Sequence, residues 1–287
     1  MYVGAGDHLQ LTHCDDACNQ KFYTLAFIIA DKTGAPAWDG RFPLETNPFA
    51  SDITALRSRG GDVIVSFGGA DGTEIGNAET NIAALASRYQ SIIDRYHLTW
   101  LDFDIEGNSL AKTNANVGRN FVLAALQKTN PGLRITFTLP VDPDGISQDA
   151  RKMLADARDQ GVKVFSANVM TMDFGANFSR GKKLSDVSIA SVLKAHEQCQ
   201  TIDPAIQIGV TAMIGQNDVH TEVFTQADAK ALEQWAEVHP WICSLSFWAS
   251  NRDAGNEGTG RNENTTSGIR QKPWEFTRIF QAFRKPR

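Results

Sequence analysis

The chain has 287 residues, of which 42% are hydrophobic and 21% are charged, so it can bury a large core and is too apolar for a disordered protein. Its 28 Lys and Arg residues against 33 Asp and Glu residues give a net charge of −5. This balance disfavours a nucleic-acid-binding protein, because phosphate binding needs a basic surface. The sequence has no run of 18 apolar residues, so it predicts no membrane-spanning segment.

Short apolar runs alternate with longer amphipathic segments along the chain. The runs are mostly rich in β-branched or aromatic residues, and the expected strands are 2–5, 22–30, 63–67, 100–105, 134–139, 164–172, 206–213 and 242–248. The expected helices are 52–59, 79–96, 114–129, 147–160, 184–200, 227–238 and 273–283. This alternation predicts an α/β fold of parallel strands and crossover helices. The count predicts a single (β/α)8 TIM barrel.

A doubly wound open sheet is the alternative architecture. No G-x-G-x-x-G turn follows the first expected strand, which disfavours the dinucleotide-binding version of that sheet. No change in composition marks a linker, so we expect one catalytic domain over residues 1–287. Residues 251–268, rich in Gly, Asn and Thr, are expected to form a long loop at the active face of the barrel.

Signals for metals, cofactors and disulfides are weak. The six histidines include no H-x-x-x-H pair, so we expect no metal site, and nothing implies a cofactor. The four cysteines leave open whether they are free thiols or form one or two disulfides. Residues 1–4 lack a basic region followed by an apolar run. No signal peptide is therefore visible in this chain, although one could have been removed.

Residues 100–107, WLDFDIEG, carry the strongest functional signal. Because side chains alternate between the two faces of a strand, Asp102, Asp104 and Glu106 share one face and the apolar residues between them take the other. The apolar face belongs against the helices, so the carboxylates point into the barrel. Buried carboxylates raise one another's pKa, which would keep Glu106 protonated near neutral pH, as a general acid requires. A solvated edge strand and a carboxylate metal site are the alternatives.

Asp102-x-Asp104-x-Glu106 resembles the catalytic signature of glycoside hydrolase family 18, the chitinases and related endo-β-N-acetylglucosaminidases. Residues 66–69, Ser-Phe-Gly-Gly, resemble the S-x-G-G element of this family, and residues 170–173, Met-Thr-Met-Asp, resemble its M-x-Y-D element. Trp248 ends the last expected strand, where the family has the tryptophan floor of its central sugar subsite. The resemblance extends over nearly the whole chain and suggests the bacterial and archaeal branch.

The resemblance implies a retaining, substrate-assisted endo-chitinase that hydrolyses β-1,4-linked N-acetylglucosamine polymers, with chitin or chito-oligosaccharides as its partners. The 2-acetamido oxygen of the sugar would attack its own anomeric carbon, while Glu106 protonates the leaving oxygen and later activates water. Asp104 would hold the acetamido N–H group, and Asp102 would set the charge and orientation of Asp104. Asp173 would contact the substrate near the bond that breaks.

The predicted substrate-binding residues lie at the ends of several expected strands. They are Trp248, Met170, Met172, Gln216, Asn217, Phe27, Ser66 and Gly69, with Trp38 as a further candidate for stacking against sugar. Met172 stands where many family members have a tyrosine that hydrogen-bonds the acetamido carbonyl. A thioether cannot donate that bond, so Gln216 and Asn217 are the candidate donors.

Two other functions share these motifs: an endo-β-N-acetylglucosaminidase acting on N-glycan cores, and a non-catalytic chitin-binding lectin, which the presence of Glu106 disfavours. Residues 214–241 are too few for the α+β domain that some family members insert there. We therefore expect an open groove that permits attack inside a polymer. Because chitin lies outside the cell, we expect a secreted protein, and we expect a monomer.

Overall fold

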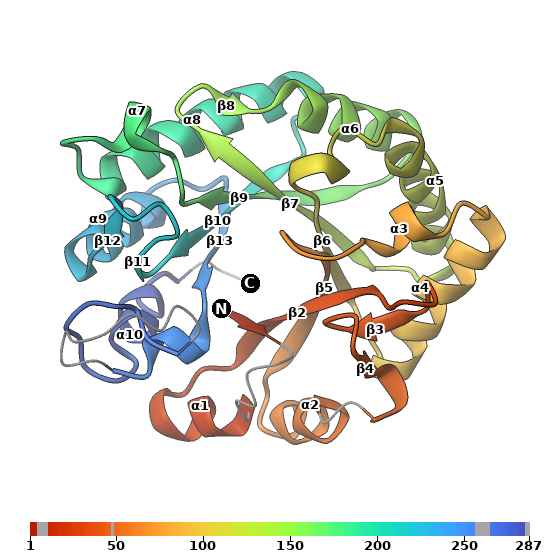
Figure 1. The fold of residues 1–287 in the computed structure, drawn as a ribbon, viewed down its shortest axis with the longest axis horizontal. Helices are drawn as coiled ribbons and strands as arrows, with labels where there is room; N and C mark the ends of the chain where they lie inside the picture. The colour runs from red at the N-terminus through yellow and green to blue at the C-terminus, as the bar shows by residue number, and fades with distance from the viewer. Residues whose placement is uncertain (5–10, 47–48, 256–264, 285–287) are drawn as a thin grey trace.

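The structure is a computed structural model that describes residues 1–4, 11–46, 49–255 and 265–284. Its centre is a run of eight parallel strands, which pair in this order: β1 (Tyr2–Gly4), β2 (Phe22–Ala30), β5 (Asp62–Gly68), β6 (Trp100–Asp104), β7 (Arg134–Asp142), β9 (Val164–Thr171), β10 (Gln207–Met213) and β13 (Ile242–Trp248). The two end strands, β1 and β13, contact each other. Figure 1 shows helices surrounding these strands. The predicted (β/α)8 fold is confirmed.

Helices cover the outside of the strands and follow them in the chain. They are α1 (Leu11–Cys18), α2 (Phe49–Ser58), α3 (Ile75–Ala78), α4 (Ile82–Tyr96), α5 (Thr113–Thr129), α6 (Gln148–Asp159), α7 (Ala176–Ser179), α8 (Leu184–Ile202), α9 (Gln226–Glu237) and α10 (Glu275–Phe280). Every predicted helix is present within a few residues of its expected bounds, whereas α1 and the short helices α3 and α7 were not predicted.

Short elements decorate the ends of the strands. They are β3 (Pro36–Trp38) and β4 (Phe42–Pro43) beside β2, β8 (Gly145–Ile146) beside β7, the hairpin of β11 (Gly215–Gln216) and β12 (Val223–Phe224), and the 3-10 turns Leu44–Thr46, Gly107–Ser109 and Ser250–Asp253. Polar caps fix where several long helices begin. Asn81 accepts a hydrogen bond from the backbone at the start of α4, and Thr225 forms a capping box with Asp228 on α9.

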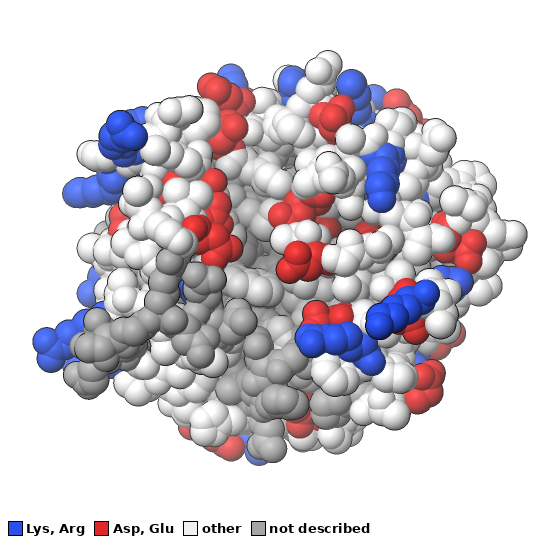
Figure 2. All heavy atoms as spheres, in the orientation of Figure 1, with Lys and Arg blue, Asp and Glu red and all other residues white. Residues whose placement is uncertain are grey.

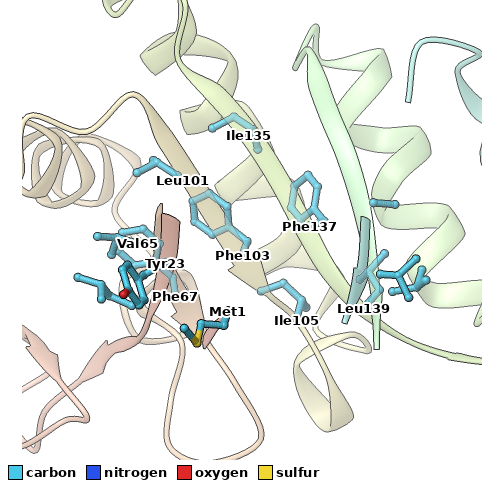
Figure 3. Close-up of a cluster of buried hydrophobic side chains, with 14 of the residues drawn as sticks. Met1, Tyr23, Val65, Phe67, Leu101, Phe103, Ile105, Ile135, Phe137 and Leu139 are labelled. Carbon is cyan, nitrogen blue, oxygen red and sulfur yellow. The ribbon is translucent and has the colours of Figure 1, made fainter. Parts of the chain in front are cut away.

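The core lies between the strands and the helices. Leu101, Phe103 and Ile105 are fully buried, and Figure 3 shows them beside the apolar side chains of β5 and β7. Phe103 stacks on Phe67 with ring centroids 5.1 Å apart and meets Tyr89 of α4 edge-on at 5.5 Å. This packing fixes the outer face of β6, so the other face of the strand must point into the barrel.

The segment between β10 and β13 is short, as predicted. Residues 214–241 contain only the β11–β12 hairpin and α9, and all of them are described, so no domain is inserted there. Half of the predicted long loop at 251–268, namely residues 256–264, lies outside the described residues. All four cysteines are free thiols. Among the described residues, no helix is long and apolar enough to cross a membrane.

Candidate active site

The acidic residues of β6 lie inside the barrel, as the alternation predicted. Asp102 and Asp104 are buried, at 2% and 4% exposure, and Glu106 is half-buried just beyond the strand's carboxyl end. Figure 2 shows acidic side chains gathered on both sides of a hollow at the centre of one face of the barrel. Among the described residues, no group of His, Cys, Asp and Glu side chains is arranged to hold a metal ion.

Hydroxyl groups from three other strands hold Asp102. Ser66 donates to Oδ2 at 2.6 Å, Thr138 donates to Oδ1 at 2.7 Å, and Tyr2 donates to Oδ2 at 3.3 Å. Burial raises the pKa of Asp102 to about 6, while these three donors oppose the rise by stabilising the charged form. Asp102 is therefore an ionised, oriented carboxylate at neutral pH.

The polar layer continues across the barrel from Asp102. The side-chain amide of Asn168 donates to the Tyr2 hydroxyl at 3.0 Å and to the Thr138 hydroxyl at 2.9 Å. Thr211 in turn donates to Oδ1 of Asn168 at 3.0 Å. Sequence reasoning missed Tyr2, Thr138 and Asn168. The available signal was a polar residue at inward positions of otherwise apolar strands.

Asp104 differs from Asp102 in having an unsatisfied oxygen. Its Oδ1 is buried and has no hydrogen-bond partner among the described residues. Burial first, and then the charges of Glu106 and Asp102, raise the pKa of Asp104 well above its ordinary value. Asp104 therefore binds a proton more readily than an ordinary aspartate does. An unpartnered buried acceptor is costly, and a donor from a bound molecule would satisfy it.

Glu106 has the properties of a general acid. Burial raises its pKa, and the charges of Asp71 and Asp173 raise it further. A raised pKa keeps the carboxyl protonated in the range where it must donate, and its partial exposure leaves it accessible. The row thus combines an orienting carboxylate, a carboxyl group with an unused acceptor oxygen and an accessible acid.

Two glycines bring the end of β5 against the site. Gly68 and Gly69 both adopt positive φ, at 102° and 92°, and the Gly69 N–H donates to the Asp104 carbonyl oxygen at 3.0 Å. A Cβ on Gly68 would overlap that same carbonyl oxygen, and one on Gly69 would lie 2.7 Å from the Phe27 ring. The S-x-G-G element therefore consists of a serine that supports Asp102 and two glycines that permit close packing.

An aromatic cluster lies beside the carboxylates. Trp248 and Phe27 stack with ring centroids 5.7 Å apart and planes 13° apart, and Tyr2 lies 6.0 Å from Trp248. Both Trp248 and Phe27 are partly exposed, so they can offer a surface to a sugar ring. Trp38 cannot, because it is fully buried and donates to the Tyr96 hydroxyl at 3.0 Å. The prediction for Trp38 is wrong.

Asp173 is positioned by the β11–β12 hairpin. Its Oδ1 accepts a hydrogen bond from the Val219 N–H at 2.7 Å, and the buried Glu222 accepts from the N–H groups of Phe174 and Gly175 at 3.0 and 2.7 Å. Burial raises the pKa of Asp173, and the Val219 bond opposes the rise. Glu222 is a supporting residue that the sequence did not single out.

Solved structures of other proteins are similar to this chain. Active domain 2 of the thermostable chitinase from Pyrococcus furiosus, complexed with chito-oligosaccharides, is 31% identical, with 98% of this chain and 92% of that chain covered and a TM-score of 0.87. This chain belongs to the chitinases of glycoside hydrolase family 18. A family 18 chitinase from Pseudoalteromonas aurantia shares the fold, with a TM-score of 0.64 at 15% identity.

The curated relatives of this chain are longer than the chain itself. A probable bifunctional chitinase/lysozyme from Escherichia coli is 29% identical over 93% of the chain, and endochitinase 11 from Metarhizium anisopliae is 30% identical over 82%. The chain spans 32% and 48% of the lengths of these two proteins. No protein-family model matches the chain.

Three predicted substrate-binding residues have other partners in the structure. Ser66 is fully buried and donates to Asp102, so it supports the carboxylate row and does not reach a substrate. Asn217 is also buried, and its amide donates to the carbonyl oxygens of Met213 and Gly215 at 2.9 and 3.2 Å. The Gln216 amide donates to the carbonyl oxygens of His220 and Glu222, at 3.0 and 2.8 Å.

The two predicted replacements for the family tyrosine both donate to backbone carbonyl oxygens. Met172 is half-buried next to Asp173, and Met170 is half-buried in β9, but thioethers donate no hydrogen bond. The amide groups of Gln216 and Asn217 are both used to hold their own loop. Arg252 adds to this loop by donating to the carbonyl oxygens of Ile214 and Gln216, at 2.9 and 2.6 Å.

Proposed function

We propose that this chain is a retaining, substrate-assisted endo-chitinase that hydrolyses β-1,4-linked N-acetylglucosamine polymers. The observation that carries the proposal is the unpartnered buried oxygen of Asp104, which lies in the row between Asp102, held by three hydroxyl donors, and Glu106, whose pKa is raised by burial. An acetamido N–H is a neutral donor of the kind that this oxygen lacks. The membership of the chain in family 18 supports the same substrate class.

The first step breaks the glycosidic bond. The acetamido oxygen attacks the anomeric carbon of its own sugar, and the bond to the leaving oxygen breaks as Glu106 transfers its proton to that oxygen. The sugar becomes an oxazolinium ion, whose N–H donates to Asp104. The negative charge shared by Asp102 and Asp104 stabilises this cation in a buried setting, where electrostatic interactions are strong.

The second step restores the enzyme. Glu106, now a carboxylate, accepts a proton from water while the water oxygen bonds to the anomeric carbon and the acetamido oxygen leaves. Each step inverts the anomeric carbon, so the product keeps the β configuration. Trp248, with Phe27 behind it, supports the reacting sugar by stacking against its C–H face.

The short segment after β10 supports an internal mode of attack. Because residues 214–241 add only a hairpin and a helix beside the site, no wall closes over the groove there, and a polymer can enter along its length. The expected products are a spread of oligosaccharide lengths. Disaccharide released almost alone from one chain end, with high processivity, would contradict this mode.

Two properties follow from the proposed substrate. Chitin is an extracellular polymer, so we propose that the protein acts outside the cell. We also propose that it acts as a monomer, since one barrel supplies Asp102, Asp104, Glu106, Asp173 and Trp248. Fractionation of the source cells and light scattering of the purified protein test these two points.

The decisive experiment is hydrolysis of soluble chitin oligomers by the wild-type protein and by Glu106→Gln, with the product anomer detected by NMR. We expect β-anomeric products from the wild type and a rate at least about 1000-fold lower for Glu106→Gln, with oligomer binding retained. Equal rates would overturn the proposal. If the wild type cleaves a high-mannose glycopeptide and not chitin oligomers, the chain is an endo-β-N-acetylglucosaminidase. Binding without cleavage would make it a lectin.

A further inference from the structure

The loop from Gly68 to Glu74 carries Asp71 along the edge of the site. Gly68 lies opposite Asp104 in the register of β5 and β6, and the Gly69 N–H donates to the Asp104 carbonyl oxygen. Asp71 follows Gly69 by two residues, and Glu106 follows Asp104 by two residues. The two acids therefore leave neighbouring parallel strands at the same edge of the barrel.

Contacts to β2 hold the outer part of this loop. The Thr73 carbonyl oxygen accepts a hydrogen bond from the Ala30 N–H at 2.8 Å. Gly72 has a φ of 83°, and a Cβ there would overlap Ile29. The backbone on the far side of Asp71 thus rests directly on β2, just as the near side rests on β6.

A buried ion pair holds the base of the loop. Glu74 and Arg119 of α5 are both fully enclosed, with a 2.9 Å contact between Nη1 and Oε2, and the Tyr89 hydroxyl donates to the other oxygen of Glu74 at 2.7 Å. Breaking such a pair leaves an uncompensated buried charge. The loop is consequently fixed at both ends, and Asp71 occupies a defined position at its apex.

The Asp71 side chain itself is exposed and takes part in no hydrogen bond or ion pair within the described part of the chain. Within the described part of the chain, the charges that raise the pKa of Glu106 belong to two carboxylates, Asp71 on the β5 side and Asp173 on the β9 side, and Glu106 also interacts with Asp104 on β6. Of the charges that raise the pKa of Glu106, that of Asp71 has the largest effect. Figure 2 shows acidic groups on both sides of the central hollow.

We propose that Asp71 is a positioning residue for the catalytic proton, a carboxylate that a fixed loop holds at the same edge of the barrel as Glu106. The inference rests on the proposed function, because it assigns Asp71 a role only through Glu106 as the acid. Nothing in the sequence motif requires an acid at this position, since Asp71 lies outside the S-x-G-G element.

The sign of the effect is fixed by electrostatics. A neighbouring negative charge disfavours ionisation of Glu106, so removing that charge lowers its pKa. The basic limb of the kcat/KM profile reports the pKa of the general acid in the free enzyme. This limb must therefore move to lower pH when the charge of Asp71 is removed. Because Asp71 is exposed, we expect the basic limb to shift by about half a pH unit. At pH values above the limb this shift lowers kcat/KM about threefold, and at pH values below the limb kcat/KM is unchanged.

The experiment compares kcat/KM for a soluble chitin oligomer against pH at low ionic strength for the wild type, Asp71→Asn and Asp71→Glu. Asp71→Asn keeps the size of the side chain and removes its charge, whereas Asp71→Glu keeps the charge and should restore the wild-type limb. Glu197→Gln is the matched control, because it removes one exposed charge from α8, on the outside of the barrel. Its profile should match the wild type.

Salt gives a second readout. Screening weakens the interaction of exposed charges, so 1 M NaCl should move the wild-type limb toward that of Asp71→Asn and leave the variant nearly unchanged. The inference would be overturned if the basic limb of Asp71→Asn stays where it is in the wild type, or if the variant loses kcat/KM equally at every pH. The proposed function would still stand in that case, provided that the wild type turns over the oligomer. A wild-type protein without turnover would instead overturn the proposed function.

Discussion

The hydroxyl of Ser66 donates a 2.6 Å hydrogen bond to Oδ2 of Asp102 inside the barrel. The bond joins β5 to β6 and links the S-x-G-G element directly to the carboxylate row. It also explains how a buried Asp102 remains charged, because Thr138 donates to its other oxygen and Tyr2 adds a third bond. Asp102 in turn gives Asp104 a charged neighbour, which after burial and the charge of Glu106 is a further reason why the pKa of Asp104 is raised.

Replacing Ser66 with Ala should destabilise the protein in a pH-dependent way. Since a bond to a charged group is worth more than one to a neutral group, Ser66→Ala should lower the free energy of unfolding by about 2 kcal/mol at pH 7. Burial holds the folded pKa of Asp102 at about 6, above its ordinary value of 3.8. The stability that Asp102 contributes is thus present below pH 4 and is lost as pH rises to 6. The free energy of unfolding of Ser66→Ala should fall more over this range than that of the wild type, because the variant lacks a donor to the charged carboxylate.

Urea denaturation at pH 4, 5 and 7 measures this difference. Ser91→Ala is the control, because Ser91 is an exposed serine whose hydroxyl donates only to a carbonyl oxygen of its own helix. It should change the free energy of unfolding by less than about 0.5 kcal/mol at every pH. An equal loss for Ser66→Ala at pH 4 and pH 7 would show that the charge of Asp102 is not involved.

The central part of the site was predictable from the sequence because it depends on local rules. The period of two along a strand places Asp102, Asp104 and Glu106 on one face, and the large apolar residues between them identify the outer face. The strand count gave the barrel for the same reason, since each parallel strand is a short apolar run between turn residues. Helix α1 was missed because its eight residues contain two acids, one of which, Asp15, is buried through an ion pair with Lys21.

The surroundings of the carboxylates could not be predicted, because they depend on residues far apart in the chain. Asn168 reaches the Tyr2 hydroxyl across 166 positions, and no local pattern contains that bond. The same limitation affected Gln216 and Asn217, whose residue types fit a donor to substrate. Their amides are instead used by backbone carbonyl oxygens within the loop.

Replacing Asp104 with Asn should stabilise the folded protein at pH 7 and lower its activity. Burial and its two acidic neighbours raise the pKa of Asp104 well above its ordinary value in the folded protein, so the folded state keeps a proton that the unfolded chain releases more readily. The stability that it contributes is present at pH values below its ordinary pKa and is lost as pH rises. Asp104→Asn removes this loss, so the variant should be more stable than the wild type at pH 7 and equally stable near pH 3.

The same variant should lose at least about 100-fold in kcat, because an amide cannot share the negative charge that stabilises the oxazolinium ion. A thiazoline analogue of that ion should bind the wild type tightly and the variant weakly. Thermal unfolding at two pH values and inhibition assays measure the two effects. A variant that is less stable than the wild type at pH 7 would contradict the raised pKa of Asp104.

Replacing Trp248 with Ala should weaken binding of the transition state, because it removes the surface on which the sugar stacks. We expect kcat/KM for chito-oligosaccharides to fall about 30-fold, which corresponds to about 2 kcal/mol. Trp248→Phe keeps an aromatic ring over Phe27 and should recover most of the loss. Trp38→Phe is the control: it should lower stability through the lost bond to Tyr96 and leave kcat/KM of the folded protein unchanged. A small effect of Trp248→Ala would remove it from the site.

Replacing Gly68 with Ala should be far more damaging than the same change at another glycine with positive φ. Gly68 has a φ of 102°, and its added Cβ would overlap the backbone oxygen of Asp104, whereas Gly34 has a φ of 82° and nothing within 4 Å. The conformation alone costs about 1–2 kcal/mol at either position. At Gly68 the overlap must also push β5 from β6, so we expect a total loss above about 3 kcal/mol. Equal denaturation midpoints for the two variants would show that the contact with β6 is not tight.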